Sequence, residues 1–164
     1  ALVQCGAIRE ANERLTRLHQ AGHTDEETVG LLARTHKDLW DTTADAAERE
    51  AHLDAAIRFY TEAWRTTGGY WTGINAATLL AVSGGAANAE HAVDVARQVA
   101  AQCRGLLEQA TGAERYWLLA TLGEAALVAG NLEAAADFYT RAAATAPGVG
   151  HLVSTRRNAR MLLR

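Results

Sequence analysis

The sequence predicts an all-α fold in which helices pair as antiparallel hairpins, and three observations support this. The 164 residues contain a single proline, Pro147, so helices are rarely interrupted. Alanine is abundant and runs of β-branched residues are missing, which favours helix along nearly the whole chain. Apolar residues recur with helical spacing between short breaks that contain glycine. We therefore expect about eight antiparallel helices.

The clearest repeat lies in the second half of the chain. It fits the frame of a tetratricopeptide unit at Leu119, Leu122, Gly123, Ala126, Ala135, Tyr139, Ala142 and Pro147. Gly123 has no side chain and lets the partner helix approach, Ala135 serves the same contact from the other side, and Tyr139 fills the space beside them. Leu119 and Ala126 depart from the Trp and Tyr that are usual at their positions. The pattern indicates a structural scaffold built from helix pairs.

Capping signals and glycines set the bounds of the expected helices. These helices cover residues 2–19, 24–40, 46–66, 73–82, 88–109, 113–129, 132–146 and 150–163. Their predicted caps are Thr24, Thr72, Asn88, Thr111 and Asn131. Thr24 and Thr111 each precede a glutamate by three residues, the spacing of a capping box. Gly22 and the glycine pairs at 68–69 and 84–85 are expected to end helices, because glycine tolerates the left-handed backbone found there.

The helices group into pairs within one predicted domain, 1–164, which we expect to be a fragment of a longer chain. The expected parts are 1–22 as the second helix of a truncated pair, 24–67, 70–110 and 112–147 as three pairs, and 150–164 as a capping helix. Ala33, Asn75 and Gly123 hold equivalent helix-crossing positions but lie 42 and 48 residues apart. This spacing predicts a divergent, right-handed helical-hairpin solenoid and not a regular array.

The last helix is expected to close the end of the solenoid. Its predicted inward residues are Leu152, Val153, Leu162 and Leu163, and its predicted solvated residues are Arg156, Arg157 and Arg160. The segment from Arg141 to Arg164 contains no acidic residue. A contact with nucleic acid or with a phosphorylated partner is an alternative use of this basic end.

The run from Gly69 to Leu80, together with Tyr116-Trp117 and the stretch 123–126, resembles the TRAFs-binding domain family. The string from Gly73 to Leu80 is its most specific part, and the likeness covers residue 24 to the C-terminus. This family occurs in the central regulatory region of the apoptosis signal-regulating kinases and in bacterial proteins with tetratricopeptide-like repeats. The resemblance implies a helical regulatory platform that gathers partner proteins. No kinase motif accompanies it.

Composition narrows the classes of function. The formal net charge of −3 disfavours a broad basic surface for nucleic acid, so protein partners are expected. Only Lys37 among the 16 basic residues is a lysine, a bias that suggests a GC-rich, bacterial genome. Two cysteines, Cys5 and Cys103, form no C-x-x-C pair, which favours a reducing cytoplasm. No apolar run is long enough for a membrane helix.

The sequence contains no clear pattern of metal-binding or catalytic residues. His19, His23 and His36 are considered as a metal set, but Gly22 interrupts their helix face and no acid completes it. No catalytic residue, metal or cofactor is predicted. An all-α enzyme with dispersed catalytic residues remains an alternative.

The predicted function is a non-catalytic protein-interaction or regulatory scaffold that binds a peptide or helix in a concave groove. The first helix of each pair lines such a groove, which places Glu27, Arg34, Lys37, Asp38, Thr72, Trp117 and Glu124 in it. The main alternative is a regulatory domain that senses a small ligand there. Self-association of the chain is left open.

Overall fold

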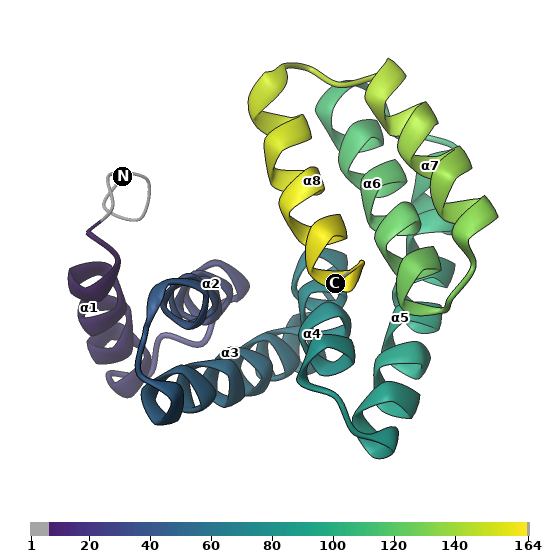
Figure 1. Cartoon of the computed structure of the whole chain (residues 1–164). Coiled ribbons are helices and arrows are strands. Elements are labelled where there is room, and N and C mark those ends of the chain that lie inside the picture. The colour runs from purple at the N-terminus through teal and green to yellow at the C-terminus, as the bar shows by residue number, and fades with distance from the viewer. Residues whose placement is uncertain (1–6, 164) are drawn as a thin grey trace. The chain divides into compact units, whose positions relative to one another are not determined.

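The computed structural model describes residues 7–163, and all regular structure in this range is α-helical (Figure 1). The helices are α1 (Ile8–Gln20), α2 (Glu26–Thr42), α3 (Ala46–Thr67), α4 (Tyr70–Ser83), α5 (Ala86–Leu107), α6 (Gly112–Val128), α7 (Leu132–Ala144) and α8 (Val149–Leu162). Contacts divide the chain into two compact units, Ala1–Leu79 and Leu80–Arg164.

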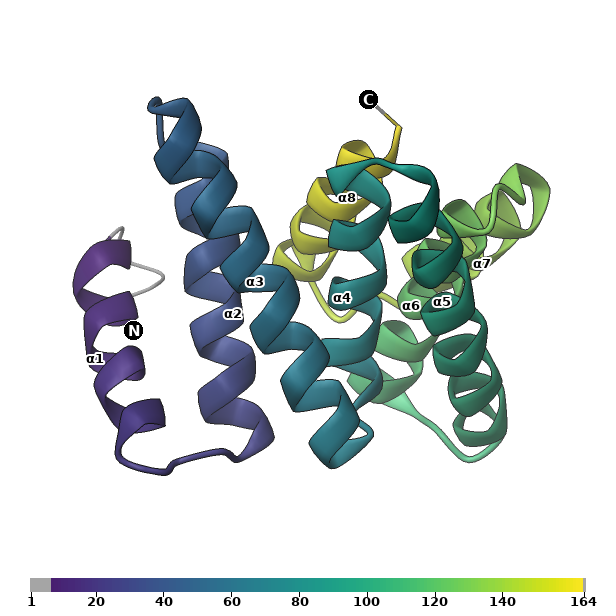
Figure 2. The same cartoon turned by 90° about the horizontal axis from the view of Figure 1, so that it is seen from below.

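In the first unit, α1, α2 and α3 lie side by side and run antiparallel to their neighbours (Figure 2). Helix α2 packs on both α1 and α3. Ala56, Tyr60 and Ala63 lie on the buried side of α3 and are almost without exposed surface. The first turns of α4 belong to the same unit, since the ring of Trp71 stands edge-on to that of Tyr60 with centroids 6.3 Å apart.

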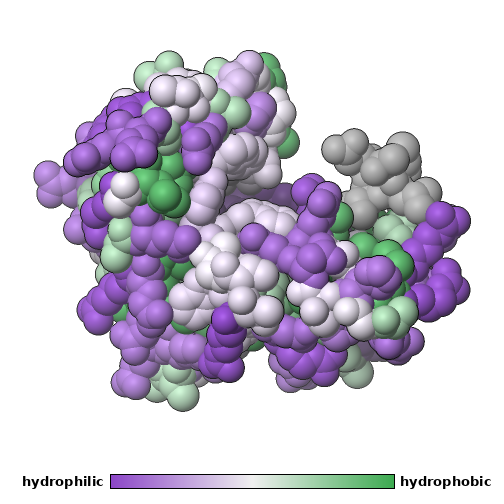
Figure 3. All heavy atoms as spheres, turned by 180° about the vertical axis from the view of Figure 1, so that it is seen from behind, coloured by the Kyte–Doolittle hydropathy of each residue, from purple (hydrophilic) through white to green (hydrophobic). Residues whose placement is uncertain are grey.

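In the second unit, α6 is the central helix and packs against α5, α7 and α8. Its residues Tyr116, Leu119 and Ala120 form a buried cluster with Ala142 of α7. The loops that connect the packed helices in both units are short, as expected for antiparallel hairpins. Figure 3 shows one face of the molecule, where polar residues predominate and apolar ones form small separate patches.

Within the described residues, side-chain caps begin α2, α3 and α7. Asn131 accepts a hydrogen bond from the backbone N–H of Ala134 at 3.0 Å, which confirms its prediction as the cap of α7. Asp45 caps α3 in the same way. The predicted cap Thr24 is wrong: Asp25 holds the position and accepts from the Thr28 N–H at 2.9 Å. A carboxylate is the better acceptor because the start of a helix carries partial positive charge.

Two further cap predictions are wrong, and a third is only partly right. Thr72 lies inside α4, which begins before it at Tyr70. Asn88 lies inside α5, because Gly85 already supplies the backbone geometry that begins this helix. Thr111 does occupy the start of α6, but its side chain makes no capping hydrogen bond. The first predicted helix began at Leu2; residues 2–6 lie outside the described range, and α1 begins at Ile8.

The predicted inward face of α8 is wrong at Leu152, Val153 and Leu163, which are exposed. Polar contacts with α6 orient the helix instead, through Thr155 and Asn158. Among the apolar residues of α8, Met161 is buried and the three predicted ones are not. Among the described helices, none combines the length and the apolar character needed to cross a membrane.

Candidate functional site

Helix α2 carries four of the residues predicted to contact a partner. Glu27 and Arg34 are seven residues apart, so they lie on the same side of the helix, and both are exposed. The Arg34 Nε atom lies 3.9 Å from an Asp38 carboxylate oxygen one turn further along. The accessible part of this face is therefore a strip of mixed charge.

Lys37, by contrast, is buried and joins α2 to α4. Its ammonium group donates to the Asn75 side-chain oxygen at 2.8 Å, and the Asn75 amide donates to the Trp71 carbonyl at 2.9 Å. Lys37 is only 5 % exposed and Asp38 only 7 %. Because a buried charge is costly unless it is paired, these contacts fix how α2 and α4 meet.

A second contact between these helices lies near the start of α4. The Thr72 hydroxyl is 3.1 Å from a Glu26 carboxylate oxygen and 2.9 Å from the Gly69 carbonyl oxygen. One turn further along α2, Gly30 contacts the Trp71 ring, and a Cβ added there would meet ring carbon Cζ3 at 2.5 Å. Thr72 has no exposed surface, so it acts within the helix contact.

The second unit contains a comparable set of contacts between α6 and α8. The Asn158 amide donates to both carboxylate oxygens of Glu124, at 3.1 and 3.2 Å. The hydroxyls of Tyr116 and Thr155 are 2.7 Å apart. Glu124 is buried, and its contact with Asn158 holds α8 against α6. Burial of the Tyr116 hydroxyl raises its pKa, and the hydrogen bond with Thr155 partly opposes this.

Trp117 is the most accessible of the predicted partner-binding residues in the second unit. The residue is 36 % exposed, and its ring packs against those of Tyr116 and His151, with centroid distances of 5.0 and 5.2 Å. An aromatic ring held in place at the surface offers a rigid contact for a protein partner. Of the seven residues predicted to line the groove, Glu27, Arg34 and Trp117 are accessible, whereas Lys37, Asp38, Thr72 and Glu124 are buried.

The predicted helix-crossing residues lie at contacts between helices. A Cβ added at Gly123 would lie 2.9 Å from two ring atoms of Tyr139 on α7. Ala33 and Ala135 are both buried, as is Asn75. The Tyr139 hydroxyl is enclosed and has no hydrogen-bond partner among the described residues. This burial raises its pKa, and the nearby negative charge of Glu124 raises it further.

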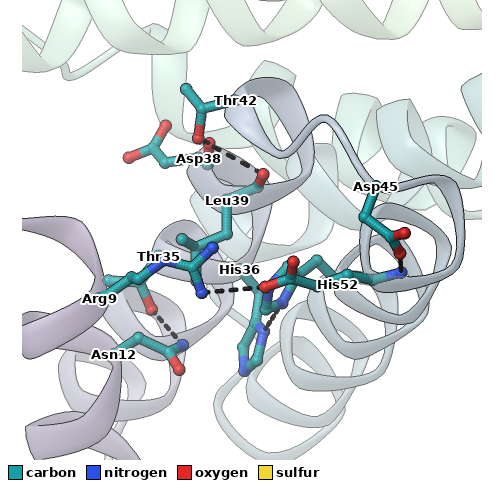
Figure 4. A network of polar contacts seen from close by, with 10 residues as sticks. Arg9, Asn12, Thr35, His36, Asp38, Leu39, Thr42, Asp45 and His52 are labelled. Atoms are coloured by element: carbon teal, nitrogen blue, oxygen red, sulfur yellow. Dashed lines mark hydrogen bonds and ion pairs between the residues drawn. The ribbon is translucent and has the colours of Figure 1, made fainter.

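A histidine network, which the sequence did not predict, connects α1, α2 and α3 (Figure 4). The Nδ1 atoms of His36 and His52 are 3.0 Å apart, and the His36 ring stacks on Phe59 with centroids 5.6 Å apart. Burial lowers the pKa of His36 from 6.5 to about 4, with further contributions from His52 and Arg58. Because this pKa lies well below 7, the His36 imidazole is neutral at neutral pH.

The other members of this network are polar pairs between the same helices. The Asn12 amide donates to the Thr35 hydroxyl at 2.9 Å, and His19 Nε2 lies 2.8 Å from a Glu62 carboxylate oxygen. Of the histidines considered together as a metal set, His19 and His36 thus have different partners. Within residues 7–163, no group of three or more His, Cys, Asp or Glu side chains could hold a metal ion.

Cys103 is the cysteine within the described range, and it is buried in the second unit. Burial raises its pKa to about 12, so its thiol stays protonated and unreactive at neutral pH. Cys5 lies outside the described residues. Nothing about Cys103 points to nucleophilic chemistry.

Sequence reasoning missed the partners of the buried polar residues, because each pair joins positions far apart in the chain. Lys37 and Asn75 are 38 residues apart, and Glu124 and Asn158 are 34 apart. One signal was present: Asn75 and Glu124 interrupt the mainly apolar sequences of α4 and α6. Such residues are rarely buried in a core without a partner.

Comparisons with known proteins agree with this architecture. The family model for Tetratricopeptide Repeats-Sensor, TPR-S, matches residues 1–80. Among solved structures, the chain is similar to a thermophilic tetratricopeptide-repeat protein of Thermus thermophilus. The TM-score is 0.66 at 19 % sequence identity, over 99 % of this chain and 77 % of that chain. No curated protein matches the chain. The chain is thus tetratricopeptide-like, and its fold is an all-α helical-hairpin solenoid.

Proposed function

We propose that this chain is a non-catalytic protein-interaction or regulatory scaffold, which binds a peptide or helix through residues on the first helices of its hairpins. The observation that carries this proposal is the mixed-charge strip of Glu27 and Arg34 on α2, which stays exposed while the helix packs on α1, α3 and α4. Exposed charges on a rigid helix fix the orientation of a partner without requiring the scaffold to rearrange. Trp117 would supply an apolar contact in the second unit.

The four buried residues of the predicted groove have a supporting role in this proposal. Lys37 and Thr72 join α2 to α4, and Glu124 joins α6 to α8. They set the positions of the helices that present the accessible residues. Substitution of a buried member is thus expected to weaken partner binding through loss of structure.

A charge exchange tests the strip. The double variant Glu27→Arg/Arg34→Glu keeps the net charge but reverses the order of charges along α2. The matched control is Asp94→Arg/Arg97→Glu, an exposed pair on α5 whose side chains are 3.6 Å apart. In affinity capture from a lysate of the source organism, wild type and control should retain the same partners, and the α2 variant should lose them. Identical partner lists from all three proteins would exclude this strip as the binding surface.

A small-ligand sensor is the second candidate, because the matching family model is described as a sensor. The segment of this chain that the model matches, residues 1–80, includes the buried polar contact between Lys37 and Asn75. A ligand that binds the folded state raises the melting temperature as its free concentration rises. A metabolite library screened by thermal shift should then give a saturable stabilisation that is weaker in Lys37→Met. Absence of any saturable hit would argue against the sensor.

The resemblance to the TRAFs-binding domain family supports a regulatory setting for the scaffold. In this proposal the chain acts as a platform within a longer bacterial protein of the cytoplasm. Its expected partners are proteins or peptides, and it needs no cofactor. A native mass measurement would show whether the chain also self-associates.

A further inference from the structure

Helix α8 has an exposed apolar side that faces away from its contacts with α6. Val149, Val153 and Leu163 are 75 %, 63 % and 65 % exposed, and Leu152 is also exposed. Isolated apolar residues on a surface are common, but a row of them on one helix is not. We call this side the outer face of α8; it consists of Val149, Leu152, Val153, Arg156, Arg160 and Leu163.

The helical repeat explains why these residues share a side. Each residue turns the helix by about 100°, so positions three, four and seven apart fall on the same side. The residues that contact α6 are His151, Thr155 and Asn158, which follow this spacing. Val149 and Val153 are offset from that set by two residues and therefore point away from α6. Helix α8 thus has one side that is packed and one that is not.

The outer face also carries positive charge with no partner. Arg156 and Arg160 lie one turn apart among the apolar residues, and within the described part of the chain neither forms an ion pair. Arg141 on α7 differs, because it lies 3.2 Å from Asp137. No acidic residue occurs from Arg141 to the end of the sequence, so this part of the chain cannot neutralise the two arginines.

We infer that the outer face of α8 binds an amphipathic helix of another protein, one that carries acidic residues beside its apolar side. Apolar residues of that helix contact Val149, Val153 and Leu163, and two carboxylates one turn apart pair with Arg156 and Arg160. Arginine forms such pairs in a fixed, two-pronged geometry, which gives specificity as well as attraction. The outer face of α8 contains none of the residues Glu27, Arg34 and Trp117 on which the proposed scaffold function rests, so the two proposals can be tested separately.

Charge decides against a second copy of this helix as the occupant. If two α8 helices paired antiparallel through their outer faces, each Arg156 near the centre would face the other Arg156. Such like-charge contacts destabilise an interface. A ligand bound only through phosphate groups would contact basic and polar side chains. It would leave the exposed valines and leucines of the outer face unused.

A pair of synthetic peptides tests this inference. Both are amphipathic helices with leucines on one side; one has two glutamates a turn apart at the edge of that side, and the other has lysines there. Binding is measured by fluorescence anisotropy with the full chain. We expect the glutamate peptide to bind at least about tenfold more tightly than the lysine peptide, and its affinity to fall as salt is raised.

Two variants and one control complete the experiment. Arg156→Glu/Arg160→Glu should reverse the preference, so that the lysine peptide binds more tightly, and Val153→Asp should weaken both peptides. The control Arg17→Glu/Arg104→Glu makes the same change in net charge at exposed positions on α1 and α5 and should leave the preference intact. Circular dichroism confirms that each variant is folded.

Several results would overturn the inference. One is equal affinity for the two peptides, or a preference that the outer-face and control variants change alike. Another is dimerisation through this face, seen as self-association that Val153→Asp abolishes without any peptide binding. Tighter binding of duplex DNA or of anionic lipid vesicles than of the glutamate peptide, lost in the arginine double variant, would assign the face to those partners instead.

Discussion

The neutral, buried imidazole of His36 makes stability depend on pH. In the unfolded chain its pKa is near the ordinary 6.5, and in the folded protein it is about 4. The unfolded state thus binds more protons than the folded state between these two values. The stabilisation is complete above about pH 6.5 and is lost as the pH falls towards about 4. From about pH 7.5 to about pH 5, linkage predicts that this group alone lowers the free energy of unfolding by about 2 kcal/mol.

Urea denaturation followed by circular dichroism, at intervals from pH 7.5 to pH 5, measures this effect. The variant His36→Gln keeps a side chain able to hydrogen bond with His52, but this side chain cannot titrate. Between about pH 7.5 and about pH 5, the free energy of unfolding of the variant should therefore fall by about 2 kcal/mol less than that of wild type. His91→Gln is the control, because His91 is exposed on α5 and its replacement should leave the dependence unchanged. If the His36 variant kept the full pH dependence of wild type, burial of this imidazole would not be its cause.

Three further substitutions test the helix contacts, each by its effect on the free energy of unfolding in urea. Gly30→Ala should destabilise by up to about 2 kcal/mol, because crowding of the Trp71 ring at 2.5 Å costs about 1–3 kcal/mol and the gain in helix propensity returns only about 1; an increase in stability would show that the ring moves freely. Asn158→Ala should cost about 1.5–3 kcal/mol, since Glu124 loses a buried charged hydrogen bond, and no loss would mean that this contact is not formed in solution. Tyr139→Phe should leave stability unchanged or raise it by about 1 kcal/mol, because the removed hydroxyl has no partner among the described residues; a clear loss would reveal a hydrogen bond to water.

The helices themselves could be predicted because their signals are local. Gly68, for example, has a φ of 73° and ends α3, as the glycine pair in the sequence predicted. Ala56, Tyr60 and Ala63 are four and three residues apart, the spacing of one helix side, and all three are buried. Both inferences need only one helix and its immediate neighbours in the chain.

The polar contacts between helices could not be predicted in the same way. Whether Lys37 faces solvent or Asn75 depends on how two helices separated by a third pack together. The orientation of α8 shows the same limit. Hydrophobicity alone predicted that Leu152 and Val153 face inward. In the structure, Asn158 faces α6 and hydrogen bonds with Glu124, and Leu152 and Val153 are exposed.

The burial of Lys37 has a practical consequence for covalent chemistry. It is the only lysine in the sequence and is 5 % exposed. The folded chain therefore offers no readily accessible side-chain amine to acylating reagents, to lysine-directed cross-linkers or to enzymes that modify lysine. Acylation of this one residue would occur only when α2 and α4 separate, so its rate would report the opening of that contact.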